Sequence, residues 1–118
     1  MTQVWFKQKG DYFSVKVEGH SCYTPARGVV PDGDIVCSAC SILAFTLLQC
    51  ILTEEADGGL YAFESSNGDG RFSAEFRCVE RKIDKIRTIF DTIISGYRLL
   101  HDSYPQNVEI FVQTREKR

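Results

Sequence analysis

Alternating hydrophobic and polar residues predict two hairpins, one at the start of the chain and one in its second half. The first pairs a β-rich segment at 4–7 with a segment at 12–17, where every second residue is apolar, across a turn at residues 9–11. The second pairs residues 60–64 with 71–77 across a polar, glycine-containing loop at 65–70. In each hairpin the alternation gives one strand a buried face, which requires a second layer in the fold.

Two helices and a final strand are predicted from the rest of the pattern. The first helix is expected to run from Asp34, a residue type that caps helices, to about Thr53. It is apolar on most faces, so we expect it to pack centrally. The second is expected over 79–103, where apolar residues recur at alternating steps of three and four: Ile83, Ile86, Phe90, Ile93, Tyr97 and Leu100. A last strand is expected around 108–112, before a charged tail.

These elements predict a fold of the α/β class, of the α+β type, with the order ββαββαβ. Two helices packed on one face of the sheet is the simplest arrangement that buries both apolar stripes. The chain has 118 residues, of which 43% are hydrophobic. That is enough apolar surface for one core, and we expect a single domain over residues 1–118.

Charge and cysteine usage limit the classes of partner. The 14 basic and 16 acidic residues give a net charge of −2, so no basic excess favours a nucleic-acid partner. Neither a secretory signal nor a membrane span is expected, because the longest apolar stretch, around 42–52, is interrupted by polar residues and is short. The five cysteines are therefore expected to be thiols in the cytoplasm rather than a disulfide framework. No cofactor is predicted.

The residues that can perform chemistry begin where the second strand ends. Gly19-His20 opens a long irregular loop that leads to Asp34, and loops of this length are usually functional. Cys37 then falls in the first helical turn, where unpaired N–H groups and the positive end of the helix dipole favour a thiolate. A histidine brought beside it can take the thiol proton and pass it to a leaving amine, while backbone N–H groups stabilise an oxyanion. These parts suffice for acyl transfer.

Other interpretations fit the same residues. Cys37 can be a packed thiol, because small buried cysteines are common. With Cys40 it forms a Cys-x-x-Cys sequence at a helix start, as in dithiol redox centres. With His20, Cys22 and Cys40 it forms a mixed nitrogen and sulfur set of the kind that binds zinc. Zinc binding would make the chain a structural or interaction module rather than an enzyme.

The order of these residues resembles that of a known family. Gly19-His20 after a strand, then the run from Gly33 to Cys37 and Ser41, is similar to the signature of the ribosomal-processing cysteine proteases, the Prp or YsxB-like family. An apolar helix, a Gly-rich hairpin, a long second helix and a last strand extend the resemblance over nearly the whole chain. It implies a small α/β cysteine endopeptidase that removes an N-terminal extension from a ribosomal protein of the large subunit.

The resemblance also implies roles for individual residues. His20 corresponds to the catalytic histidine and Cys37 to the nucleophile, with Gly19, Asp34, Ser38 and Ser41 as supporting residues. Asp34 either caps the helix or orients His20. His20 and Cys37 lie 17 positions apart, more than the family leads us to expect. The lengthened loop is the predicted substrate-binding segment: Ser21, Cys22, Tyr23, Gly28, Val29, Val30 and Gly33.

Two expectations concern the loop and the assembly. A loop placed between base and nucleophile, with glycines and prolines in it, is expected to close over an extended peptide. The family tends to pair, and the predicted sheet has an edge strand beside a second helix with a long apolar stripe. We therefore expect a symmetric homodimer. Its expected substrate is a ribosomal protein precursor.

Overall fold

Five strands form one mixed sheet, in the order β3-β4-β2-β1-β5, within the residues that the structure describes, which are 1–19 and 35–115. The structure is a computed structural model. The strands are β1 (Thr2–Lys9), β2 (Tyr12–Glu18), β3 (Leu60–Gly68), β4 (Arg71–Cys78) and β5 (Val108–Arg115). Neighbouring strands are antiparallel except β1 and β5, which run parallel. The first strand of the chain therefore lies between the second and the last.

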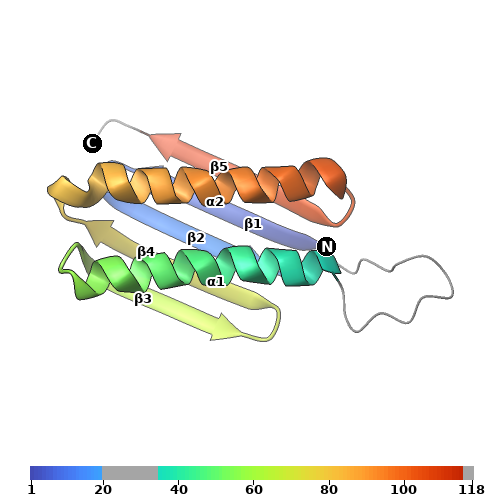
Figure 1. Ribbon diagram of the computed structural model, residues 1–118, viewed down its shortest axis with the longest axis horizontal. Helices are drawn as coiled ribbons and strands as arrows, with labels where there is room; N and C mark the ends of the chain where they lie inside the picture. The colour runs from blue at the N-terminus through green and yellow to red at the C-terminus, as the bar shows by residue number, and fades with distance from the viewer. Residues whose placement is uncertain (20–34, 116–118) are drawn as a thin grey trace, which may run out of the picture.

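The helices α1 (Ile35–Ala56) and α2 (Ile83–Ser103) lie side by side and cover one face of this sheet (Figure 1). A short 3-10 turn, η1 (Glu80–Lys82), leads into α2. The order ββαββαβ and the position of both helices on one face confirm the predicted fold. α1 continues past the predicted end at Thr53. Its predicted cap, Asp34, lies outside the described residues.

Both hairpins close through two-residue turns that contain a glycine at positive φ. Gly10 has a φ of 60° between β1 and β2, and Gly70 has a φ of 68° between β3 and β4. Residues other than glycine rarely adopt such values. The second turn is tighter than the predicted loop at 65–70, because β3 continues to Gly68, which pairs with Arg71. Arg71 also pairs with Glu18, so this turn lies beside the end of β2.

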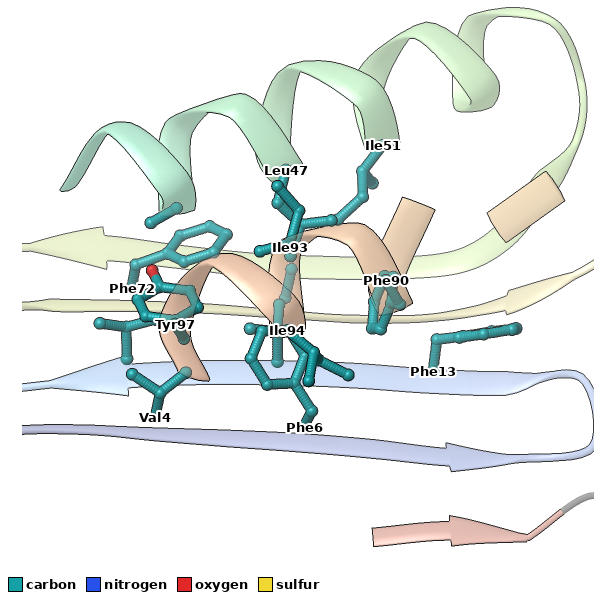
Figure 2. Close-up of a cluster of buried hydrophobic side chains, with 14 of the residues drawn as sticks. Val4, Phe6, Phe13, Leu47, Ile51, Phe72, Phe90, Ile93, Ile94 and Tyr97 are labelled. Atoms are coloured by element: carbon teal, nitrogen blue, oxygen red, sulfur yellow. The ribbon is translucent and has the colours of Figure 1, made fainter. Parts of the chain in front are cut away.

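The core lies between the inner face of the sheet and the two helices, as Figure 2 shows. Phe13 of β2 and Phe76 of β4 stack with ring centres 5.6 Å apart, and Phe90 of α2 meets Phe13 edge-on at 5.1 Å. α2 uses its whole predicted stripe here: Ile83, Ile86, Phe90, Ile93 and Tyr97 are buried, and Leu100 is partly buried. The period of three and four residues therefore identified the inner face of α2 correctly.

α1 is buried on one side only, so the prediction that it packs centrally is wrong. The buried side consists of Val36, Cys40, Ala44, Leu47, Ile51 and Glu54. Other parts of its surface expose large apolar side chains, among them Ile42, Phe45 and Leu52. Because apolar residues occur around most of α1, its hydrophobic pattern cannot distinguish the inner face from the outer one.

By length and composition α1 is also long and apolar enough to cross a membrane. Its most apolar 18-residue window has a mean hydropathy of 2.3, and 28% of that window is buried in the fold. The expectation that no span is present considered only residues 42–52, whereas the apolar helix runs from Ile35 to Ala56. The core helix of a soluble protein meets the same criterion, so the observation is weak evidence for a membrane.

A buried carboxylate joins the end of α1 to the start of α2. The side chain of Glu54 is only 4% exposed, and its oxygens lie 2.5 Å from Nζ of Lys85 and 2.9 Å from Nζ of Lys82. Lys82 also pairs with Asp57 at 2.7 Å. The hydrogen bonds from Lys85 and then from Lys82 hold the pKa of Glu54 below its ordinary value, against the opposing effect of burial.

We predict that Glu54→Gln lowers the free energy of unfolding by about 2–3 kcal/mol at about pH 7, because two cations lose their buried anion. The pKa of Glu54 is lower in the folded than in the unfolded chain, where it is about 4.3. Its stabilisation is therefore present above the unfolded pKa and is lost as the pH falls through the folded pKa. Urea denaturation at about pH 7 and about pH 3 should show a gap between wild type and variant that shrinks in acid.

Asp84→Asn is the matched control, because the Asp84 side chain is 98% exposed in its pair with Arg87. It should change stability by less than about 0.5 kcal/mol. A gap of equal size at both pH values would contradict the role given to the Glu54 carboxylate.

Candidate active site

Cys37 lies near the start of α1 and lines a hollow of about 210 Å³. Three parts of the fold enclose this hollow: the first turns of α1, the end of β2 at Gly19, and the turn between β3 and β4. Figure 1 shows all three at the same end of the molecule, beside the N-terminus. Cys37 is half-buried there, so its side chain packs against the protein on one side and borders the hollow on the other.

The position of Cys37 follows from where α1 begins. The helix starts at Ile35, which makes Cys37 its third residue. The N–H groups of a first turn have no acceptor within the helix itself, and the helix dipole is positive at that end. Such a position suits an oxyanion that develops close to the thiol, because these N–H groups can stabilise its charge. The described geometry therefore agrees with the chemistry predicted for Cys37.

Gly19 follows the last residue of β2 at the edge of the hollow, in a conformation that only glycine adopts readily. Its φ is 93°, and its N–H donates a hydrogen bond of 2.7 Å to the carbonyl oxygen of Gly70 in the β3–β4 turn. A Cβ atom at this position would clash with the carbonyl oxygen of Met1. The chain therefore leaves β2 at a fixed point beside the hollow, one residue before His20.

The lining of the hollow combines apolar and polar side chains. Its apolar part comes from β2, α1 and β4 and consists of Val17, Ala44, Phe45 and Phe72. Its polar part comes mainly from the end of the β3–β4 hairpin: Asn67, Asp69 and Arg71. Small-molecule and peptide sites commonly have this composition, with an apolar surface and a few polar groups that fix orientation.

Cys40 lines the same hollow one helical turn after Cys37, but it is almost fully buried. Its backbone carbonyl oxygen accepts a hydrogen bond of 2.8 Å from the hydroxyl of Tyr97 in α2. Burial raises the pKa of the Tyr97 hydroxyl, so the hydroxyl keeps its proton and stays a donor. This bond ties the start of α1 to α2 and thereby positions Cys37.

Two further described cysteines, Cys50 and Cys78, lie outside the hollow. Cys78 is buried in β4, and this burial raises the pKa of its thiol to about 11. It is therefore protonated near neutral pH and unsuited to act as a nucleophile. Cys50 is half-buried on α1. Neither residue lines the hollow, which leaves Cys37 as the candidate nucleophile in the described part of the chain.

The structure brings three of the predicted site residues, Gly19, Cys37 and Ser41, together around the hollow. Ser38 follows Cys37 in sequence, but it is exposed and does not line the hollow. The other predicted site residues lie outside the described residues: His20, Asp34, Ser21, Cys22, Tyr23, Gly28, Val29, Val30 and Gly33. Their roles, and the closure of the loop over a peptide, stay predictions.

The zinc interpretation depends on the same undescribed segment, because two of its four ligands would be His20 and Cys22. Within residues 1–19 and 35–115, no group of three or more potential ligand side chains could hold a metal ion.

The β3–β4 turn and Phe45 are parts of the hollow that the sequence pattern did not single out. The run Asn67-Gly68-Asp69-Gly70 indicates a tight turn, but it does not show what the turn faces. Phe45 is one of many apolar residues around α1, and its pattern does not show which of them face the site. The turn joins the site through the pairing of β4 with β2, which are distant in the sequence, and Phe45 lines it from about two helical turns further along α1 than Cys37.

Comparison with known proteins gives one family and several similar folds. The family model described as cysteine protease Prp matches residues 1–109. The ribosomal processing protease Prp of Staphylococcus aureus, solved with a covalently linked product peptide, has a TM-score of 0.67 at 18% identity over 96% of this chain and 100% of that chain. The same S. aureus protease with a substrate peptide gives 0.62 at 18% identity with the same coverage.

A Streptococcus mutans protein has a TM-score of 0.65 at 22% identity, over 98% of this chain and 96% of that chain. At such identities the likeness to these solved structures establishes the fold. The comparison with curated proteins finds no relative.

We predict that Gly19→Ala lowers the free energy of unfolding by about 2–4 kcal/mol, because a Cβ is strained at positive φ and clashes with the Met1 carbonyl. Gly58→Ala is the matched control: Gly58 has a φ of 75°, but nothing lies within 4 Å of an added Cβ. It should cost only about 1 kcal/mol. Thermal denaturation measures both values. Equal losses would show that the close contact beside Met1 does not fix Gly19.

Proposed function

The chain belongs to the family of the cysteine protease Prp, and on that premise we propose that it is a processing endopeptidase that removes an N-terminal extension from a large-subunit ribosomal protein. The observation that carries the proposal is the family match over residues 1–109, which includes Cys37 and all three walls of the hollow. The position of Cys37 near the start of a helix supports the nucleophilic role that the family implies.

In the proposed reaction the Cys37 thiolate attacks the carbonyl carbon of the scissile peptide bond. A carbon–sulfur bond forms, and N–H groups near the start of α1 stabilise the negative charge on the carbonyl oxygen. His20 takes the thiol proton and donates it to the leaving amine as the carbon–nitrogen bond breaks. A water molecule, deprotonated by His20, then attacks the thioester, which releases the new carboxyl terminus and restores the thiol.

The lining of the hollow supports a peptide as substrate. An extended peptide presents successive side chains to opposite sides, so one apolar side chain can enter the hollow between Phe45 and Phe72 while the main chain passes Cys37. The S. aureus protease of this fold has been solved with a substrate peptide and with a covalently linked product peptide. Because these peptide complexes have the same fold as this chain, we assign the peptide substrate of this chain to the hollow.

We propose that the enzyme acts in the cytoplasm as a homodimer. The proposed reaction needs no nucleic acid, membrane or cofactor. The apolar stripe of α2 cannot be the dimer surface, because its residues are buried or partly buried in the core. The exposed apolar side of α1 replaces it as the expected dimer surface.

We predict that Cys37→Ser lowers the rate of precursor cleavage by at least about 1,000-fold, because the hydroxyl is a far weaker nucleophile than the thiolate. His20→Ala should cost a similar factor, and the double variant should be no slower than either single one, because the two groups act as a unit. The assay incubates the purified chain with the ribosomal precursor and follows product masses. Wild-type turnover by Cys37→Ser would refute the assignment of the nucleophile.

Cys40→Ser is the matched control, because Cys40 lines the same hollow but its thiol has no role in the proposed reaction. It should retain most of the activity, as should Cys22→Ser. If both of these variants were inactive and the wild type carried one zinc ion per chain, the zinc-binding interpretation would replace the protease.

A further inference from the structure

Two thiols, those of Cys37 and Cys40, border the same hollow. They lie three residues apart near the start of α1, and they are present as thiols rather than as a disulfide. Cys37 is half-buried and Cys40 is only 3% exposed, so Cys37 is the more accessible of the two to a small reagent. The proposed cleavage reaction uses Cys37 alone, which leaves the second thiol beside it without a chemical role.

The spacing of the two cysteines almost matches that of a disulfide. Residues three apart on an α-helix have Cα atoms about 5 Å from each other, inside the range of about 4.4–6.8 Å found in disulfides. Their Cβ atoms are about 5–6 Å apart, whereas a disulfide needs about 3.5–4.5 Å. A shift of about 1–2 Å in the first turn of the helix would therefore bring the two sulfur atoms within bonding distance.

The surroundings of the two residues show which of them can move. Cys40 is held in place, because its side chain is buried and its carbonyl oxygen accepts the hydrogen bond from Tyr97. Cys37 is the third residue of α1 and belongs to the first turn, where N–H groups have no acceptor within the helix and the ends fray. The shift can therefore occur on the Cys37 side. A disulfide closed in this way is strained, and strained disulfides are easily reduced.

The other described cysteines cannot replace Cys40 as the partner of Cys37. Cys50 lies 13 positions after Cys37 in the same helix, which separates the two by about 20 Å at the rise of an α-helix. Cys78 is the last residue of β4, at the opposite end of that strand from Arg71, which lines the hollow. Within the described residues, a disulfide at Cys37 therefore needs Cys40.

We propose that Cys37 and Cys40 form a peroxide-reactive dithiol, in which oxidation of Cys37 is captured as a reversible Cys37–Cys40 disulfide. First, the Cys37 thiolate attacks one oxygen of hydrogen peroxide. The oxygen–oxygen bond breaks, Cys37 is oxidised to a sulfenic acid, and the other oxygen leaves as hydroxide, which takes up a proton to become water. The Cys40 sulfur then attacks the Cys37 sulfur, the sulfur–oxygen bond breaks, and the hydroxide leaves as water with the Cys40 proton.

The disulfide protects the candidate nucleophile from irreversible oxidation. A sulfenic acid that no thiol captures reacts with more peroxide to give sulfinic acid, which thiols do not reduce. A disulfide, in contrast, is returned to two thiols by exchange with a small thiol. In the reducing cytoplasm such a bond is transient. Its effect on cleavage rests on the role of Cys37 in the proposed function, whereas its formation does not.

The test treats the purified full chain with hydrogen peroxide, alkylates the remaining thiols under denaturing conditions and maps the cysteines by mass spectrometry. The wild type should yield a peptide in which Cys37 and Cys40 are joined, and dithiothreitol should restore both thiols. Cys40→Ser and Cys40→Ala should lack this product and should accumulate at least about 10-fold more sulfinic acid on Cys37 at the same dose of peroxide. Circular dichroism checks that each variant is folded.

Cys50→Ser is the matched control, because Cys50 is a half-buried cysteine of the same helix that does not line the hollow. It should form the disulfide as the wild type does. Cys22→Ser should also form it, which tests the cysteine outside the described residues. A disulfide that joins Cys37 to Cys22, or equal amounts of sulfinic acid in the wild type and in both Cys40 variants, would overturn the proposal.

Precursor cleavage by the same samples separates this proposal from the proposed function. Each chain is compared with its own untreated sample. The wild type should lose cleavage with peroxide and regain most of it with dithiothreitol, whereas Cys40→Ser should regain little. A chain that forms the disulfide but cleaves no precursor would support the dithiol and refute only the protease. A chain that cleaves the precursor but forms no disulfide would refute only the dithiol.

Discussion

The hydrogen bond from the Tyr97 hydroxyl to the Cys40 carbonyl oxygen fixes the part of the fold on which the site depends. Tyr97 is fully buried and its ring lies 5.9 Å from that of Phe6, so its hydroxyl reaches α1 from a rigid position on the core. Cys37 lies one turn before Cys40, and the same bond therefore sets its place relative to β2 and the β3–β4 turn. Glu54 holds the other end of α1 against two lysines. A helix held at both ends cannot slide along the sheet.

Much of the fold could be predicted because its signals are local. The stripe of α2 has one period and one apolar face, and the alternating residues of β2 and β4 have only one side to bury. α1 could be recognised as a helix, but its orientation could not be predicted, because residues such as Leu47 and Ile42 are equally apolar and only one of them is buried. The parallel pairing of β1 with β5 joins the two ends of the described chain, and no local pattern encodes it.

The candidate site also has a part that local sequence signals predict and a part that they do not. The place of Cys37 in a first helical turn, after a strand that ends just before Gly19, could be predicted from neighbouring residues and from the family resemblance. The walls could not, because Phe45 on α1 and Arg71 at the start of β4 are distant in the sequence and line one hollow only in the folded chain. His20 and its loop lie outside the described residues, so the base remains a prediction that rests on the sequence and the family.

The central claim is that Cys37 is the nucleophile of a Prp-type protease. The most direct measurement incubates the full chain with a thiol-reactive peptide that carries the precursor cleavage sequence and then maps the covalent adduct by mass spectrometry. The account predicts one adduct per chain, on Cys37, with loss of precursor cleavage in proportion to labelling. Labelling of another cysteine in place of Cys37, or full cleavage activity in a chain labelled at Cys37, would contradict it.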